Sequence, residues 1–200
     1  MFEIAEYIGT IAFAISGFFV GVRSRLDFLG VLISVFLTAF GGGVIRDIIV
    51  DKTPYAFTHT ASGVIVITVM FLLITLKFHK KESLENRPFF ILSDSIGLAS
   101  FSITGALIAI EAHFNLTGVL ALSFVTAVGG GITRDVIINE VPFVFKTGFY
   151  GTISLLVALL MYTFNYFELM NLYSTTAIFM VALTLRVLAY YKRWSIPLVE

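Results

Sequence analysis

The chain has 200 residues with 13 basic and 13 acidic side chains, so it lacks the excess positive charge typical of nucleic-acid binding. Apolar residues make up 58% and charged residues 13%, against roughly 45–50% and about 25% in soluble domains, so lipid is the expected solvent. The absence of cysteine excludes disulfides, thiolate metal sites and cysteine nucleophiles. The N-terminal MFEIAEYIG has no basic region, so we expect the first apolar segment to be a span rather than a signal peptide.

Seven apolar segments have about the 20 residues that a helix needs to cross a bilayer core of about 30 Å. They lie at about 4–22, 28–50, 58–78, 90–110, 116–138, 145–165 and 173–191. Short polar or proline-containing stretches separate them. The sequence therefore predicts an all-α membrane protein, with one transmembrane domain over residues 1–200 and seven transmembrane helices.

The basic residues are distributed unequally between the two sides that this topology defines. One side receives Arg23, Arg25, Lys77, Lys80, Lys81, Arg87, Lys146, Arg186, Lys192 and Arg193, and the other receives Lys52 and Arg46. Loops rich in lysine and arginine stay in the cytoplasm. We therefore expect the N-terminus outside and the C-terminus in the cytoplasm.

An internal repeat organises the chain. Residues 38–57 and 126–145 align without a gap and are identical at ten of twenty positions. The same offset of 88 relates most of repeat 1, about 3–78, to repeat 2, about 90–165, and leaves a seventh helix at 173–191. Because each repeat has three spans, the second must enter the membrane from the opposite face. Inverted repeats of this kind are typical of transporters, whose site lies at the interface between the repeats.

Each repeat carries three consecutive glycines inside a predicted span. The triplets are Gly41, Gly42 and Gly43 in one repeat, and Gly129, Gly130 and Gly131 in the other. Three glycines weaken a helix by roughly 3 kcal/mol, so we expect both helices to break there. Such breaks are tolerated at membrane depth where they are buried in protein or line a water cavity, and their free carbonyls help to coordinate cations. The alternative is close helix packing, the expected use of Gly17 and Gly21.

An Arg-Asp pair follows each triplet, Arg46–Asp47 in the first repeat and Arg134–Asp135 in the second. Arginine at the bilayer centre costs at least about 2.5–3.5 kcal/mol and usually faces a partner or a cavity. Adjacent helical residues point about 100° apart, so we expect each charge to find its partner elsewhere. Glu6 and Asp94, themselves related by the offset, are the acidic candidates. The alternative is that both pairs are structural clamps whose arginines snorkel to the membrane interface.

The three histidines, His59, His79 and His113, show no metal-ligand spacing, and no nucleotide-binding or hydrolase motif occurs. We therefore expect no metal, no cofactor and no enzyme activity.

Two three-helix units, each with Gly-Gly-Gly-x-x-Arg-Asp, followed by a seventh helix, resemble the bacterial members of the trimeric intracellular cation (TRIC) channel family over about residues 3–191. These sequences are also grouped as small glycine transporters. The resemblance implies a homotrimer in the bacterial inner membrane that contacts lipid and conducts monovalent cations, chiefly potassium. It also implies a pore within each protomer, lined by the kinked second and fifth spans, with Arg46 and Arg134 near its constriction.

Three functions remain open at this point: a passive cation channel, a secondary transporter of a small zwitterion such as glycine, and a structural membrane protein. A fixed guanidinium repels potassium unless carboxylates or carbonyls offset it. One hypothesis is that Arg46 is a movable plug, bound to freed carbonyls of Gly41–Gly43 when closed and to an acidic partner when open.

Overall fold

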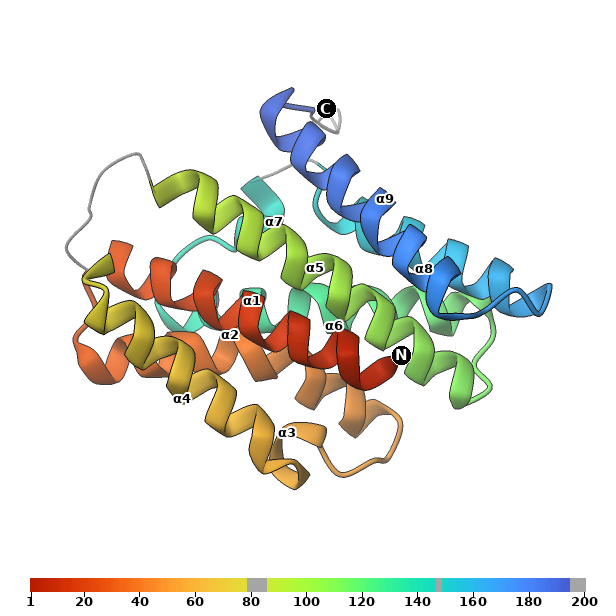
Figure 1. Ribbon diagram of the computed structural model, residues 1–200, viewed down its shortest axis with the longest axis horizontal. Helices are drawn as coiled ribbons and strands as arrows, with labels where there is room; N and C mark the ends of the chain where they lie inside the picture. The colour runs from red at the N-terminus through yellow and green to blue at the C-terminus, as the bar shows by residue number, and fades with distance from the viewer. Residues whose placement is uncertain (79–85, 147–148, 195–200) are drawn as a thin grey trace.

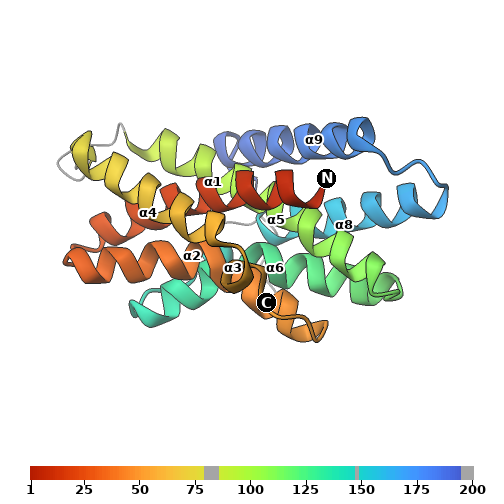
Figure 2. The same ribbon diagram turned by 60° about the horizontal axis from the view of Figure 1, so that its bottom comes forward.

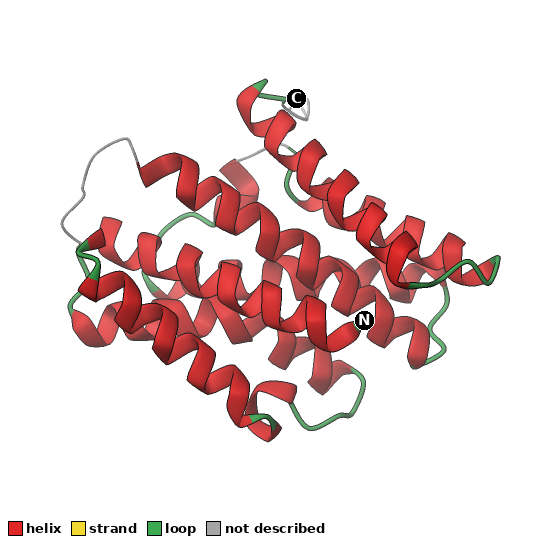
Figure 3. Ribbon diagram, in the orientation of Figure 1, coloured by secondary structure: helices red, strands yellow, loops and turns green. Residues whose placement is uncertain are grey.

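The computed structural model describes residues 1–78, 86–146 and 149–194, all of them helix or connecting loop (Figure 3). Most of the basic stretch at 79–88, with Lys80 and Lys81, lies outside these residues. The helices are α1 (Phe2–Arg23), α2 (Phe28–Ile49), α3 (Tyr55–Thr58), α4 (Thr60–Thr75), α5 (Asn86–Glu111), α6 (Leu116–Ile137), α7 (Phe143–Lys146), α8 (Gly151–Tyr166) and α9 (Leu172–Tyr191).

Five helices in the described part of the chain, α1, α2, α5, α6 and α9, are long and apolar enough to cross a membrane. Helices α4 and α8 are also apolar but have only 16 residues each. They are shorter than the predicted spans at 58–78 and 145–165 because a separate one-turn helix, α3 or α7, precedes each of them. At His59 the extended backbone, with φ −116° and ψ 100°, separates α3 from α4.

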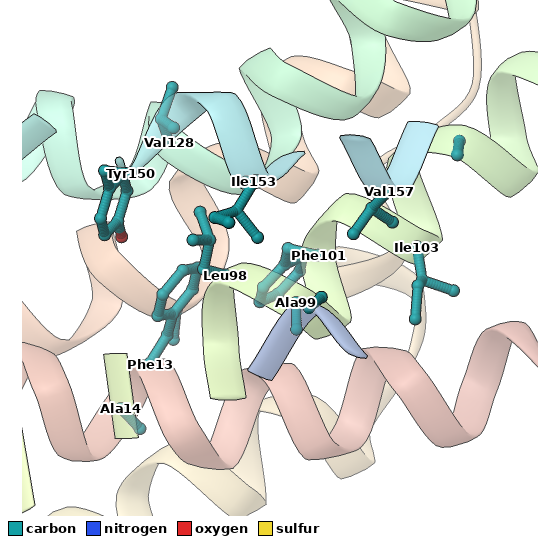
Figure 4. Packing of buried hydrophobic residues seen from close by; sticks show 14 of the residues in the cluster. Phe13, Ala14, Leu98, Ala99, Phe101, Ile103, Val128, Tyr150, Ile153 and Val157 are labelled. Carbon is teal, nitrogen blue, oxygen red and sulfur yellow. The ribbon is translucent and has the colours of Figure 1, made fainter. Parts of the chain in front are cut away.

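Helices α1 and α5 lie side by side at the centre of the bundle (Figures 1 and 2). Helix α4 packs against α1 and α2, and α8 packs against α5 and α6, so the flanking helices repeat the same arrangement. Helix α9 covers α5 and α8. The central contact is reciprocal: Phe13 stacks on Phe101 at 5.2 Å, Gly9 accommodates the Phe101 ring, and Gly97 accommodates the Phe13 ring (Figure 4).

The expected helix breaks at the glycine triplets are wrong. Helix α2 runs without interruption through Gly41–Gly43, and α6 runs through Gly129–Gly131. The reason is that the triplets gain more from packing than they lose in helix propensity. The alternative of close helix packing therefore describes these glycines, as it does Gly17, which faces the α2 backbone.

The triplets bring the backbones of α2 and α6 into direct contact. A methyl group at Gly130 would lie 2.5 Å from the Thr38 carbonyl oxygen, and one at Gly41 would lie 3.0 Å from the Gly130 Cα. A methyl group at Gly42 would overlap the Thr126 carbonyl oxygen. Only glycine permits this crossing distance.

The seven longer helices all end in the same way, on a non-glycine residue in the left-handed region. These residues are Arg25, Asp51, Lys77, His113, Asn139, Glu168 and Arg193, with φ between 53° and 59°. Each follows a helix C-cap, the position usually taken by glycine. The second repeat reproduces the ends of the first, because the Lys52 amide donates to the Asp47 carbonyl and the Glu140 amide donates to the Asp135 carbonyl.

Replacing Gly42 with alanine should destabilise the fold by about 1–3 kcal/mol, since the added methyl group forces the two backbones apart. The measurement is the thermal unfolding midpoint in detergent. Gly63→Ala is the matched control, because nothing lies within 4 Å of a methyl group at Gly63 in α4. The control should be neutral or slightly stabilising. Equal midpoints for the two variants would contradict the role given to the crossing.

Candidate functional site

Arg46 is the centre of a buried ionic cluster between α1, α2 and α5. Its side chain is 0% exposed. Nη1 lies 2.7 Å from Glu6 Oε2 and donates to Thr104 Oγ1 at 3.0 Å, while Nε donates to Asp47 Oδ1 at 2.7 Å. We call Arg46, Glu6, Asp47 and Thr104 the first cluster. The arginine is enclosed by protein and does not extend to the bundle surface.

The expectation that adjacent Arg and Asp residues do not pair is wrong. Both oxygens of Asp47 accept from Arg46, at 2.7 and 3.2 Å. The flexible arginine side chain spans the angle between the two residues, with Nε and Nη2 both donating to the Asp47 carboxylate. The bonding also differs from the plug hypothesis, since the guanidinium binds carboxylates and a hydroxyl rather than the carbonyls of the triplet.

Aromatic side chains cover the first cluster near the start of α1. The Arg46 guanidinium lies 5.0 Å from the Phe2 ring centre, and Phe2 meets Tyr55 edge-on at 5.5 Å. Asp47 Oδ2 accepts from the Tyr55 amide at 2.8 Å, which ties the cluster to α3. Partial burial, followed by the hydrogen bond with Tyr7, raises the pKa of the Tyr55 hydroxyl, so this phenol stays neutral at physiological pH.

The second repeat builds a related cluster around Arg134. Its Nε donates to Asp135 Oδ1 at 2.8 Å, and Asp135 Oδ2 accepts from the Phe143 amide at 2.8 Å. Phe90 meets Phe143 edge-on at 5.5 Å, as Phe2 meets Tyr55 in the first repeat. We call Arg134, Asp135 and Asp94 the second cluster.

The two clusters differ at the acidic residue contributed by α1 or α5. Glu6 binds Arg46 directly, whereas Asp94, one methylene shorter, accepts from Ser16 at 3.1 Å. Arg134 Nη1 instead donates to Thr38 Oγ1 at 3.3 Å. The second cluster is therefore less completely paired than the first.

Arg186 on α9 is a further buried cation. Its side chain is 2% exposed and its guanidinium lies 4.7 Å from the Tyr150 ring centre. From the sequence, Arg186 is counted only among the cytoplasmic cations. The signal that identifies it is a charge inside a predicted span, which usually marks a functional position.

Two exposed ion pairs lie at opposite ends of the bundle. Lys52 Nζ is 3.0 Å from Glu111 Oε1, and Arg23 Nη2 is 3.7 Å from Glu140 Oε2. The offset of 88 relates the pairs with their charges exchanged, because Lys52 corresponds to Glu140 and Arg23 to Glu111. Each pair joins a helix end of one repeat to a helix end of the other.

Within the described residues, no group of three or more His, Asp or Glu side chains has an arrangement that could hold a metal ion. The buried carboxylates are instead paired with arginines or hydroxyl groups.

Comparison with protein families gives one match, to the family described as Glycine transporter, over residues 3–80 and 91–166. The chain is 34% identical to the UPF0126 membrane protein YvgT of Bacillus subtilis over 98% of its own length and 95% of the relative's. It is 31% identical to the UPF0126 inner membrane protein YadS of Escherichia coli K12, over 96% of this chain and 92% of that protein.

Solved structures with the same fold are cation channels. One, from work on the structural basis for conductance through TRIC cation channels, superimposes with a TM-score of 0.88 at 31% identity and covers 100% of this chain and 98% of that one. A prokaryotic TRIC channel crystallised in 0.5 M KCl superimposes with a TM-score of 0.86 at 27% identity, over 98% of each chain. These matches are channels rather than enzymes.

Replacing Arg46 with glutamine should destabilise the protein by about 3–5 kcal/mol, because two buried carboxylates lose their counter-charge. Lys52→Gln is the matched control, because it also removes a cation that is paired with a carboxylate on another helix. The Lys52–Glu111 ion pair is exposed, so its loss should cost only about 0–1 kcal/mol. Chemical unfolding in mixed micelles measures both. Similar losses of stability would contradict the ionic role given to the first cluster.

Proposed function

We propose, since the chain belongs to the family of small membrane proteins described as glycine transporters, that it is a monovalent cation channel conducting chiefly potassium. The likeness to TRIC cation channels across the full chain, at 31% identity, is the observation that carries this proposal. Those structures are named as channels for cations, and both halves of this chain contribute to the same fold.

In this proposal the chain is a single transmembrane domain of seven helices. Repeat 1 covers about 3–78, repeat 2 about 90–165 in inverted orientation, and the seventh helix about 173–191. The N-terminus lies outside and the C-terminus in the cytoplasm of a bacterial inner membrane. The exchanged ion pairs support the inversion, since each links helix ends that must share a membrane face. The functional unit is a homotrimer with one pore in each protomer and lipid around it.

The proposed pore is lined by α2 and α6 and runs beside the contact between Gly41–Gly43 and Gly129–Gly131, where the two backbones touch. The clusters of Arg46 and Arg134 flank it. In the first cluster two carboxylates face one guanidinium, giving a formal charge of −1 that favours a passing cation despite the arginine. Gly43 faces Arg46 and Gly131 faces Arg134, so the path passes these charges beside the crossing.

The described conformation represents the closed state in this account. Arg46 is fully enclosed and holds α1, α2 and α5 together through Glu6, Asp47 and Thr104. Opening requires some of these hydrogen bonds to exchange for water or for the permeating ion. Arg46 is thus a gate residue, though its closed-state partners differ from those of the plug hypothesis.

Transport of glycine is the second candidate function. The description of the matched family names this substrate, and a zwitterion would suit a buried arginine and a buried carboxylate in one site. Measuring potassium flux and glycine uptake side by side, with purified protein in liposomes, separates the two functions. A channel gives discrete unitary currents with ionic reversal potentials, whereas saturable glycine uptake without such currents would overturn the proposal.

Thr104→Val should raise the open probability about tenfold, because it removes one hydrogen bond to the charged Arg46 and keeps the side-chain volume. Planar-bilayer recording measures this. Thr152→Val in α8 is the control, since the Thr152 hydroxyl is buried without a hydrogen-bond partner and its loss should leave gating unchanged. Unaltered open probability in Thr104→Val would count against the first cluster as a gate.

A further inference from the structure

Arg186 is buried and yet has unpaired polar atoms. Nε and Nη2 have no hydrogen-bond partner among the described residues, and the guanidinium instead lies against the rings of Tyr150 and Phe143, at 4.7 and 5.9 Å. The great majority of buried hydrogen-bond donors in proteins have an acceptor, so a buried donor without one calls for an explanation. It is a strong exception here because the group is charged.

Asp94 presents the complementary exception. Its Oδ1 accepts from Ser16, but Oδ2 is buried without a partner in the described structure. The Arg186 guanidinium lies 4.7 Å from the Tyr150 ring centre, and the Tyr150 hydroxyl interacts with Asp94. Asp94 and Arg186 therefore both contact Tyr150, each keeps buried polar atoms without a hydrogen-bond partner, and no direct salt bridge joins them.

The internal repeat shows which contact is replaced. Asp94 corresponds to Glu6 and Arg134 to Arg46, so repetition of the first cluster would pair Asp94 with Arg134. Arg134 binds Asp135 and Thr38 instead. Arg186, whose guanidinium lies against Tyr150, comes from α9, a helix with no counterpart in the first repeat.

The three arginines that are buried among the described residues differ in how many hydrogen bonds they make. Arg46 makes five hydrogen bonds to three residues, Arg134 binds Asp135 and Thr38, and Arg186 has two unpaired nitrogens. Helix α9 packs chiefly on α5 and α8, at the edge of the bundle. A displacement of α9 therefore moves the Arg186 charge away from Asp94 without breaking a hydrogen bond at Nε or Nη2.

We propose that the Arg186 guanidinium is a tethered counter-ion that occupies the position of a permeating monovalent cation beside Asp94. While Arg186 is in place, its charge offsets Asp94 and opposes cation entry into this half of the path. When α9 moves outward, a potassium ion takes its place at Asp94. This inference rests on the proposed channel function and assigns the regulation of cation passage to α9.

The test is potassium flux into liposomes through wild type, Arg186→Met, Lys192→Met and the double variant Arg186→Met/Asp94→Asn. Arg186→Met keeps a long side chain without the charge and should raise flux about tenfold, because the positive charge that competes with the ion is removed. Lys192→Met removes an exposed cation just beyond α9 and should leave flux unchanged. The double variant should lose the gain, because Asp94 no longer attracts the ion.

Thermal unfolding of each variant accompanies the flux measurement, so that a change in folding is distinguished from a change in conduction. If Arg186→Met does not accumulate, Arg186→Gln and Arg186→Lys make the same comparison, with raised flux expected only for glutamine. Folded, conducting variants of Arg186 with wild-type flux would overturn the inference. Failure of wild type itself to conduct would instead overturn the proposed channel function.

Discussion

The direct contact of the α2 and α6 backbones is the constraint on which the rest of the structure depends. A methyl group at Gly42 has no room beside the Thr126 carbonyl, and one at Gly130 has none beside the Thr38 carbonyl. Close approach of this kind is how helices associate where lipid removes the hydrophobic driving force between them. It also sets where the polar clusters lie, since each arginine follows its triplet by one turn.

The buried charges make the bundle specific as well as stable. Removing one member of a buried pair is costly, although a well-packed apolar replacement of the whole pair is often not. The retention of Glu6, Arg46 and Asp47 in a lipid-embedded core therefore points to a use beyond stability. The second repeat keeps the Arg134–Asp135 pair but leaves Asp94 incompletely paired, so the two repeats are chemically unequal.

Much of the fold could be predicted from the sequence, because apolar length and an exact offset of 88 residues report directly on helices and repetition. The same offset and the cost of intramembrane charge identified Glu6 and Asp94 as candidate partners, but only the structure assigns Glu6 to Arg46. The prediction of a helix break at Gly41–Gly43 was wrong. Helix propensity describes an isolated helix, whereas here the packing partner in the other repeat decides the outcome. The angle between adjacent helical residues also gave a wrong prediction for Arg46 and Asp47. The flexible arginine side chain bends far enough to reach the neighbouring carboxylate.

The role of Arg186 could not be predicted in the same way. Positive charge near the end of a predicted span reads as a topological signal, and only the tertiary arrangement brings α9 to Tyr150 and Asp94. The short helices α3 and α7 were likewise not predicted: α3 ends where the span predicted at 58–78 begins, and α7 straddles the start of the span predicted at 145–165. Both cases depend on contacts between elements, which a single sequence reports only through composition.

The central claim, that ions and water reach the first cluster when the protein opens, is tested most directly by thiol accessibility, because the natural chain has no cysteine. Single variants Thr104→Cys and Ala106→Cys place a thiol on opposite sides of α5, at two fully buried positions. Under conducting conditions, a small cationic thiol reagent should modify the cysteine at 104 at a rate that added potassium lowers. The same reagent should leave the cysteine at 106 unmodified. Equal resistance of both thiols in an actively conducting preparation would contradict the account.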